Sequence, residues 1–297
     1  MNRAKPTIGL IGLGLVGTAL ARRLLGAGLR VVGYDIDARR CAALTELGAR
    51  AAGSVAELAR ECPRIVVAVF NTAQLEDVVE GKAGVLANPA TAPGPRMVLN
   101  VTTSDPDRVA ALAVRVAPKG LTLLEVPISG TSEQIVHGDG VGLIGGERAA
   151  FDAAADILDA ICPKRYFVGA AGNGAKTKLA VNLILGLNRA ALAEGLVFAE
   201  RLGLDPRAFL EVARGSAAYS QVMDVKGGKM LERDFTAHGK ITQHLKDVHM
   251  MLDHAGRARQ ELPLLQVVAQ MLESCVRQGE GEWDNAAVIE EIRRRHR

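Results

Sequence analysis

Two lysines, Lys176 and Lys178, stand two residues apart in the segment GNGAKTKLAVN (residues 172–182), at the start of a run that is apolar on all sides. A helix that is apolar all round must be mostly buried. On a helix, residues four apart share a face, whereas residues two apart point in nearly opposite directions. Lys178 therefore shares a face with Asn182, and Lys176 does not. Both lysines could instead be solvated residues of a first helical turn, and this segment alone does not separate the two interpretations.

A glycine pattern near the N-terminus indicates where a nucleotide could bind. The stretch GLIGLGLVG contains Gly12, Gly14 and Gly17 in the spacing G-x-G-x-x-G, directly after a β-like run and at the start of a helical one. Such glycines permit a tight turn and the close approach of a pyrophosphate, which the N–H groups of the helix N-terminus then hold. We expect Leu15 and Val16, between the glycines, to contact the same ligand. The alternative is a glycine-rich turn without a ligand.

An acidic residue in the expected place turns this pattern into a prediction of NAD binding. Asp35 ends the next β-like run, about twenty residues on, where a carboxylate can accept hydrogen bonds from the adenosine ribose hydroxyls. A carboxylate also repels a 2′-phosphate, and the residues that follow it are Ile36 and Asp37 rather than arginine. NAD is therefore favoured over NADP, although Arg39 and Arg40 are close enough in sequence to weaken the preference.

With a dinucleotide site in the chain, Lys178 acquires a chemical role. Hydride transfer to a carbonyl leaves an alkoxide that needs a proton, and the reverse reaction needs a proton removed. A lysine whose pKa is lowered by burial can do both near neutral pH. Asn182, one helical turn further on, can hold the substrate oxygen or a water. We therefore predict Lys178 as the general acid/base and Asn182 as its catalytic partner.

The predicted strands and helices that must position these groups follow two different patterns along the chain. Up to about residue 168, short β-like runs alternate with helical segments, which predicts a mostly parallel sheet with helices on both faces. After Gly169 every segment has a helical pattern. We predict a Rossmann-type, doubly wound α/β nucleotide-binding domain over residues 1–168. An all-helical domain for substrate and oligomer contacts should occupy residues 169–297, joined to the first by the long helix after Gly172.

Composition excludes several classes of protein. The 297 residues carry a net charge of +3 with both signs interspersed, which gives no footprint for nucleic acid. We recognise neither a signal peptide nor an uncharged stretch long enough to span a membrane. The cysteines are scattered without a CxxC pair, which indicates reduced thiols in a cytoplasmic, soluble protein: Cys41, Cys62, Cys162 and Cys275.

Two further expectations concern metal and assembly. The histidines of the second half are spaced too irregularly to form a metal cluster, so we expect no metal: His238, His244, His249 and His254. The helix after Asn182 is apolar on all faces, and a helical domain of this size has limited capacity to bury it alone. We therefore expect a homodimer or homotetramer.

The motifs together resemble the β-hydroxyacid dehydrogenases, which include 3-hydroxyisobutyrate dehydrogenase and tartronate semialdehyde reductase. NVTTSDP (residues 100–106) is similar to the family's D-x-S-T-x-x-P, and EVPISGT (125–131) to D-A-P-V-S-G-G. GNGAKTKLAVN is similar to G-x-G-x-x-x-K-x-x-N-N, and HLKDV (244–248) to a late K-D pair. The resemblance covers essentially the whole chain. It implies hydride transfer between a small β-hydroxy acid and its semialdehyde or keto acid, and it places the general acid/base on Lys178 rather than Lys176.

The resemblance also implies roles for residues of the substrate site. Ser129, Gly130 and Thr131 would bind the substrate carboxylate through hydroxyl and backbone N–H donors. Thr131 departs from the family pattern, which has a second glycine there. His238 stands in a stretch where the family commonly has P-G-F, and it could hydrogen-bond a substrate hydroxyl. The alternative for His238 is an exposed loop histidine.

Four further residues would contact the cofactor by the same resemblance. Phe70 and Asn71 would lie along it, and Thr103 would lie near its nicotinamide ribose. Lys246 would reach the nicotinamide end, unless it is a helix-surface lysine paired with a neighbouring acid.

Short matches narrow the substrate, and two other classes of protein stay open. FNTAQLEDVVEG and WDNAAVIEEI look more like the L-threonate dehydrogenase branch, which favours a polar hydroxy acid of three or four carbons. Imine reductases are similar in overall sequence but characteristically lack the lysine found at Lys178. A non-catalytic NAD-binding protein would need neither Lys178 with Asn182 nor Ser129 with Gly130.

Overall fold

All the strands that the described residues form belong to one sheet, within residues 7–169. In the computed structural model, residues 7–91 and 95–295 are described. The strands are β1 (Thr7–Ile11), β2 (Arg30–Tyr34), β3 (Arg50–Ala51), β4 (Arg64–Val67), β5 (Met97–Asn100), β6 (Thr122–Glu125), β7 (Ile128–Ser129), β8 (Val141–Gly145) and β9 (Lys164–Gly169). Among the described residues beyond Gly169, an isolated bridge between Lys240 and Asp284 is the only β pairing.

The order of the strands is that of a doubly wound nucleotide-binding sheet. The sheet runs β3-β2-β1-β4-β5-β6-β8-β7, with β9 paired to β8. The strands from β3 to β6 are parallel, whereas β8 is antiparallel to both β6 and β7. The order reverses between β1 and β4. In open α/β sheets, ligands bind outside the carboxyl ends of the strands at such a switch point.

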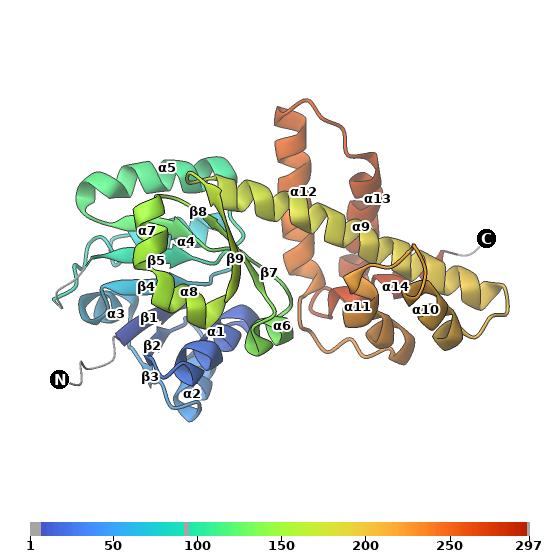
Figure 1. The fold of residues 1–297 in the computed structure, drawn as a ribbon, viewed down its shortest axis with the longest axis horizontal. Helices are drawn as coiled ribbons and strands as arrows, with labels where there is room; N and C mark the ends of the chain where they lie inside the picture. Colours follow the sequence, from blue (N-terminus) through green and yellow to red (C-terminus); the bar gives the residue numbers. More distant parts are fainter. Residues whose placement is uncertain (1–6, 92–94, 296–297) are drawn as a thin grey trace. The chain divides into compact units, whose positions relative to one another are not determined.

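Helices cover this sheet on both faces (Figure 1). They are α1 (Leu15–Gly26), α2 (Ala38–Glu46), α3 (Val55–Glu61), α4 (Thr72–Glu80), α5 (Pro106–Val116), η1 (Ala117–Lys119), α6 (Ser132–His137), α7 (Arg148–Ala153) and α8 (Ala155–Ile161). Side chains alternate between the two faces of a strand. In β4, Val66 joins the core under α1 and α8, whereas Ile65 and Val67 join the core under α3, α4 and α5. Both faces of the sheet are therefore buried.

The chain divides into two compact units, Met1–Lys178 and Leu179–Arg297. One long helix, α9 (Asn173–Arg201), begins in the first unit and continues into the second. The remaining helices are α10 (Pro206–Arg214), α11 (Gln221–Glu232), α12 (Ile241–Arg257), α13 (Pro263–Arg277), η2 (Asn285–Ala287) and α14 (Val288–Arg294). A parallel-sheet unit, a helical unit and a long helix confirm the predicted fold class. The division falls inside α9, and the expected domain boundary at residues 168 and 169, at the end of β9, stays a prediction.

Helix α9 contributes to the core of the second unit. Its residues Ala193 and Leu196 are fully buried in a cluster with residues of α11, α12, α13 and α14. By length and composition α9 is the one described helix apolar enough to cross a membrane, with a mean hydropathy of 1.4 over 18 residues. A core helix passes the same test. Because α9 also carries buried Lys178, Asn182 and Arg189, we assign it to the core.

Candidate active site

In the glycine turn after β1, two glycines are required by packing within the protein, and a third faces open space where a ligand could bind. Gly12 has a φ of +90°, and a Cβ there would lie 2.4 Å from the carbonyl oxygen of Ala68. A Cβ on Gly17 would lie 1.8 Å from the carbonyl oxygen of Gly12. These two positions need glycine because of the chain's own packing. A Cβ on Gly14 would meet no protein atom closer than 3.9 Å, so the space beside Gly14 is open.

The start of α1 offers the hydrogen-bond donors that a pyrophosphate needs. Gly14 is the N-cap of α1, and it has no side chain to bond the first N–H groups of the helix. Leu15 is exposed at this end, whereas Val16 packs partly against the core. Unsatisfied N–H groups and the positive end of the helix dipole favour an anion here. The residues present therefore fit the pyrophosphate of a dinucleotide.

Asp35 is held rigidly at the end of β2. Its side chain is buried, and its carboxylate accepts hydrogen bonds from the N–H groups of Leu13 (2.7 Å) and Asp37 (2.9 Å). The guanidinium of Arg40 lies 3.3 Å from the same carboxylate, and it is also the group nearest to the open side of Gly14. A carboxylate has about four acceptor sites, so Asp35 can still accept from a ribose hydroxyl.

The two arginines that follow Asp35 behave differently. Arg39 makes two hydrogen bonds to the carboxylate of Asp37, and these hold the pKa of Asp37 below its usual range. Arg39 is thus committed to a surface pair. Arg40 alone stands beside the ribose position, a distinction that the sequence did not make.

The other residues expected to bind the cofactor lie at the same edge of the sheet. Phe70 and Asn71 follow β4, and Thr103 follows β5, a parallel neighbour of β4. Asn71 caps α4 by accepting from the N–H of Gln74, whereas the Phe70 side chain is 46% exposed. The turn before Thr103 is fixed by buried Asn100, which accepts from the N–H of Thr102 (3.0 Å). These positions and the glycine turn therefore share the carboxyl-terminal edge of parallel strands.

The two lysines of α9 have opposite environments. Lys176 is exposed, whereas Lys178 is 7% exposed, as their spacing predicted. The Nζ of Lys178 donates a hydrogen bond of 2.8 Å to the carbonyl oxygen of Ile128. Ile128 is followed in the chain by Ser129 and Gly130, the expected substrate-binding residues. The structure thus brings the ammonium group to the backbone of this segment.

Thr131 is used partly by the protein itself. Its N–H donates to the side chain of Gln134 (2.9 Å), and its hydroxyl accepts from the N–H of Gln134 (3.2 Å), which forms a capping box at the start of α6. The N–H of Thr131 is therefore occupied. The hydroxyl proton is left to donate, and the preceding residue, Gly130, has a φ of +153°, which favours glycine.

In the second unit, Asn182 is oriented by Asp247 of α12. The amide nitrogen of Asn182 donates to the Asp247 carboxylate (3.0 Å), and both side chains are buried. A carboxylate can only accept, so the amide oxygen of Asn182 faces away as an acceptor. Lys246 lies 3.0 Å from the other Asp247 oxygen and is 18% exposed, so it pairs with a neighbouring acid without being a surface lysine. Asp247 was not predicted, although it is the second residue of the K-D pair.

His238 lies in the loop before α12 and is partly buried. Its backbone N–H donates to the carboxylate of Asp284 (2.8 Å), as does the N–H of Gly239 (3.2 Å). Asp284 thereby fixes the loop that carries the histidine.

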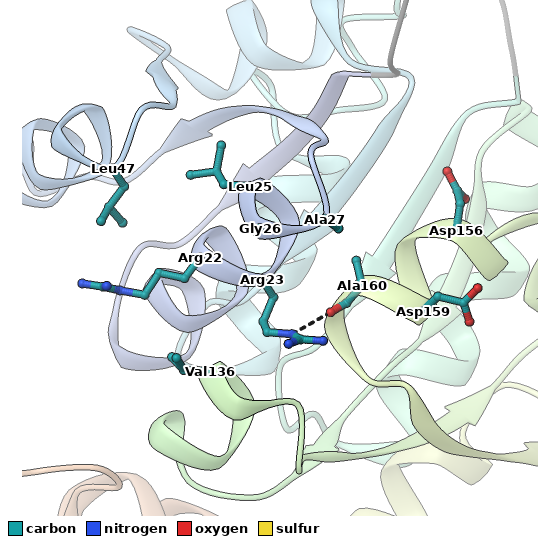
Figure 2. A pocket seen from close by; sticks show the side chains of 10 residues that line it. All are labelled: Arg22, Arg23, Leu25, Gly26, Ala27, Leu47, Val136, Asp156, Asp159 and Ala160. Atoms are coloured by element: carbon teal, nitrogen blue, oxygen red, sulfur yellow. Dashed lines mark hydrogen bonds between the residues drawn. The ribbon is translucent and has the colours of Figure 1, made fainter.

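A surface pocket of about 710 Å³ lies elsewhere on the first unit (Figure 2). It is lined by residues 22, 23 and 25–27 of the α1 region, with Leu47, Val136, Asp156, Asp159 and Ala160. The Nε of Arg23 donates to the carbonyl oxygen of Ala160 across it. None of the residues predicted to bind cofactor or substrate lines this pocket, so we assign it no part in the chemistry.

Comparison with known proteins covers both units. Residues 7–169 match a family model described as the NAD binding domain of 6-phosphogluconate dehydrogenase. Residues 172–292 match one described as NAD-binding of NADP-dependent 3-hydroxyisobutyrate dehydrogenase. L-threonate dehydrogenase of Cupriavidus necator is 34% identical over 95% of this chain and 94% of its own. The Escherichia coli K12 enzyme of the same name is 29% identical over 95% and 93%.

A solved structure gives the same picture. The crystal structure of 3-hydroxyisobutyrate dehydrogenase from Salmonella typhimurium superposes with a TM-score of 0.86 at 28% identity. The match covers 96% of this chain and 99% of that one. Sequence and fold similarity therefore extend over the glycine turn, the Lys178 segment and the helical unit alike.

Proposed function

Because the chain belongs to the β-hydroxyacid dehydrogenase family and is an NAD(P)-dependent hydroxyacid dehydrogenase, we propose that Lys178 is its general acid/base. The observation that carries this assignment is the buried ammonium of Lys178, held 2.8 Å from the Ile128 carbonyl beside Ser129. Lys176, on the same helical turn, is exposed to solvent.

The proposed chemistry divides between cofactor and protein. A nicotinamide cofactor held by the glycine turn and Asp35 would supply the hydride acceptor for oxidation of the hydroxy acid, and the hydride donor for the reverse reaction. In one direction Lys178 takes the hydroxyl proton as the neutral amine, and in the other its ammonium form donates a proton to the carbonyl oxygen. Its positive charge also stabilises the developing alkoxide. Asn182, one turn along α9, presents its amide oxygen to the substrate hydroxyl because Asp247 holds its nitrogen.

The substrate carboxylate is assigned to residues 129–131, at the end of β7 and the start of α6. The hydroxyl groups of Ser129 and Thr131 and the N–H of Gly130 are donors that suit a carboxylate. The N–H of Thr131 is excluded because Gln134 accepts it. A threonine in place of the family's second glycine adds a hydroxyl, which favours a substrate with further polar groups.

We propose a polar hydroxy acid of three or four carbons as the substrate. Two relatives that match 95% of this chain are named L-threonate dehydrogenase, which agrees with the two short sequence matches to that branch. The test is a panel containing L-threonate, D-threonate, L-serine, glycerate and 3-hydroxyisobutyrate, each assayed for NADH and NADPH formation. A clear preference for 3-hydroxyisobutyrate over the polyhydroxy acids would contradict this assignment.

We expect the protein to prefer NAD over NADP, and we expect Arg40 to make this preference smaller. Asp35 repels a 2′-phosphate, but the Arg40 guanidinium beside it attracts one. Replacing Arg40 with alanine should lower kcat/KM with NADP about tenfold, the effect of one charged hydrogen bond, and change the value with NAD less. Arg39→Ala is the matched control, because Arg39 is already paired with Asp37. A wild-type kcat/KM higher with NADP than with NAD would refute the preference.

We also expect a homodimer or homotetramer in solution. Three large apolar side chains are each at least 60% exposed: Ile184 and Phe198 in the second-unit part of α9, and Leu202 directly after its end. Such side chains are costly to leave in water and suit burial against a second copy. Light scattering at micromolar concentration should report a multiple of 31.4 kDa. A monomer at that concentration would show that these side chains have another use.

A further inference from the structure

A buried acid at the end of β6 holds the start of α9. Glu125 is 1% exposed, and its carboxylate accepts hydrogen bonds from the N–H groups of Gly172 and of Ala175 (2.8 Å). Burial raises the pKa of the Glu125 carboxyl above its ordinary value, against the opposing effect of these backbone donors. The charge of Lys176 also favours the ionised form of Glu125. The backbone N–H groups at the start of α9 are thus hydrogen-bond partners of this carboxylate.

The surroundings of Glu125 are built closely around its side chain. A Cβ on Gly145 of β8 would lie 2.6 Å from the carboxylate and 2.7 Å from the backbone nitrogen of Gly174. A Cβ on Gly174 would lie 3.0 Å from the Cβ of Glu125. The family motif similar to EVPISGT has aspartate at this position. The longer glutamate thus occupies a space that two glycines leave open.

The same short segment contacts α9 a second time. The carboxylate of Glu125 accepts from the N–H of Ala175. Three residues further along each of these two segments, the carbonyl oxygen of Ile128 accepts from the Nζ of Lys178. The first contact fixes the first turn of the helix, and the second fixes the tip of the lysine. Because these contacts are in matching register, the place of the lysine tip depends on the anchoring of the helix start.

We propose that Glu125 is a positioning residue for Lys178: its carboxylate anchors the first turn of α9 so that the ammonium reaches the segment that binds substrate. The proposal rests on the function proposed for Lys178. A misplacement of about 1 Å, even from a change away from the reacting atoms, can lower a rate by about a hundredfold. Loss of the anchor should therefore lower kcat without removing any group that touches substrate or cofactor.

The test compares Glu125→Gln with the matched control Glu147→Gln, an exposed glutamate after β8. The glutamine keeps the shape but turns an NH₂ group toward backbone donors, so one anchoring bond is lost. We expect kcat to fall about ten- to a hundredfold, with the NADH dissociation constant and substrate KM changed less than about threefold. Glu125→Asp keeps the charge and both acceptor oxygens, and it should recover part of the lost kcat.

A second readout does not depend on activity. An amine-reactive reagent, followed by mass spectrometry, measures how fast Lys178 and Lys176 are labelled in the protein without cofactor. Glu125→Gln should speed labelling of buried Lys178 and leave exposed Lys176 unchanged. If Glu125→Gln does not fold, Gly145→Ala replaces it, since the new Cβ presses on the same carboxylate from β8 and should give the same two changes.

Unchanged kcat together with unchanged Lys178 labelling, in whichever of these variants folds, would overturn the proposal. Equal losses in kcat and NADH affinity would also overturn it, because they would indicate general disruption of the nucleotide site. Failure of the proposed function is separate. Lys178→Ala would then retain activity, while faster labelling of Lys178 in Glu125→Gln would still show that Glu125 positions the lysine.

Discussion

Replacing Lys178 with alanine is expected to lower kcat by about 10²–10⁴-fold, the usual contribution of general acid–base catalysis, with NADH affinity nearly unchanged. The ammonium is buried and held at the Ile128 carbonyl, whereas the cofactor is assigned to the glycine turn and Asp35. Loss of the positive charge beside the developing alkoxide adds to the effect. The measurements are kcat by absorbance at 340 nm and NADH binding by fluorescence.

Lys176→Ala is the internal control for this result. Lys176 lies on the same turn of α9 but is exposed, so the Lys176→Ala variant should retain nearly all of the wild-type kcat. If Lys178→Ala keeps more than about a tenth of wild-type kcat, or Lys176→Ala loses as much, the proton-transfer group has been misassigned.

The face of α9 that carries Lys178 could be predicted because it follows from local geometry. The spacing of four residues places Lys178 on the same face of the helix as Asn182, whereas Lys176 lies on the opposite face. Lys178 is buried and Lys176 is exposed, in agreement with this prediction. The fold class could be predicted from the sequence for the same reason. Alternation of strand and helix, and glycines that a turn or a close approach requires, are properties of short segments.

The contacts that hold Lys178 and Asn182 in place could not be predicted from the sequence, because they join distant parts of the chain. Glu125 reaches residues 172 and 175, and Asp247 reaches Asn182 from 65 positions away. A hydrogen bond between residues so far apart in the sequence leaves no periodic pattern from which it could be predicted. The capping box of Thr131 with Gln134 is different, since the pattern T-x-x-Q predicts it from the sequence alone. It was missed because Thr131, the residue in place of the family's second glycine, was interpreted only as a substrate-binding residue.

A second large effect is expected in the helical unit, around a fully buried carboxylate. Asp284 is 0% exposed and pairs with the Lys226 ammonium at 2.7 Å. Its oxygens also accept from the N–H groups of His238, Gly239 and Ala286. Arg189, also buried, has a pKa lowered to about 10 by desolvation, which the charge of Asp284 opposes. One acid thus balances two buried cations and fixes the loop before α12.

Burial alone would raise the pKa of Asp284, but the charge and hydrogen bond of Lys226 and the backbone donors outweigh it and hold the pKa below its ordinary value. For an acid with a depressed folded pKa, the stabilisation is fully present above the unfolded pKa of about 3.9 and is lost as pH falls through the folded value. Asp284→Asn should therefore be much less stable than wild type at pH 7, and the difference should shrink on acidification below about pH 4.

Asp284→Ala is expected to destabilise the protein by about 3–5 kcal/mol at pH 7, because it leaves Lys226 and Arg189 as uncompensated buried charges. At roughly 2–4 °C per kcal/mol, the Tm measured by circular dichroism should fall by about 10 °C. Glu232→Ala is the control, since Glu232 forms an exposed pair with Arg207 at 3.4 Å and its loss should change stability by less than about 1 kcal/mol. If the two variants melt within about 2 °C of each other, then Asp284 does not hold the helical unit together, and the two cations must be balanced by solvent or by another chain.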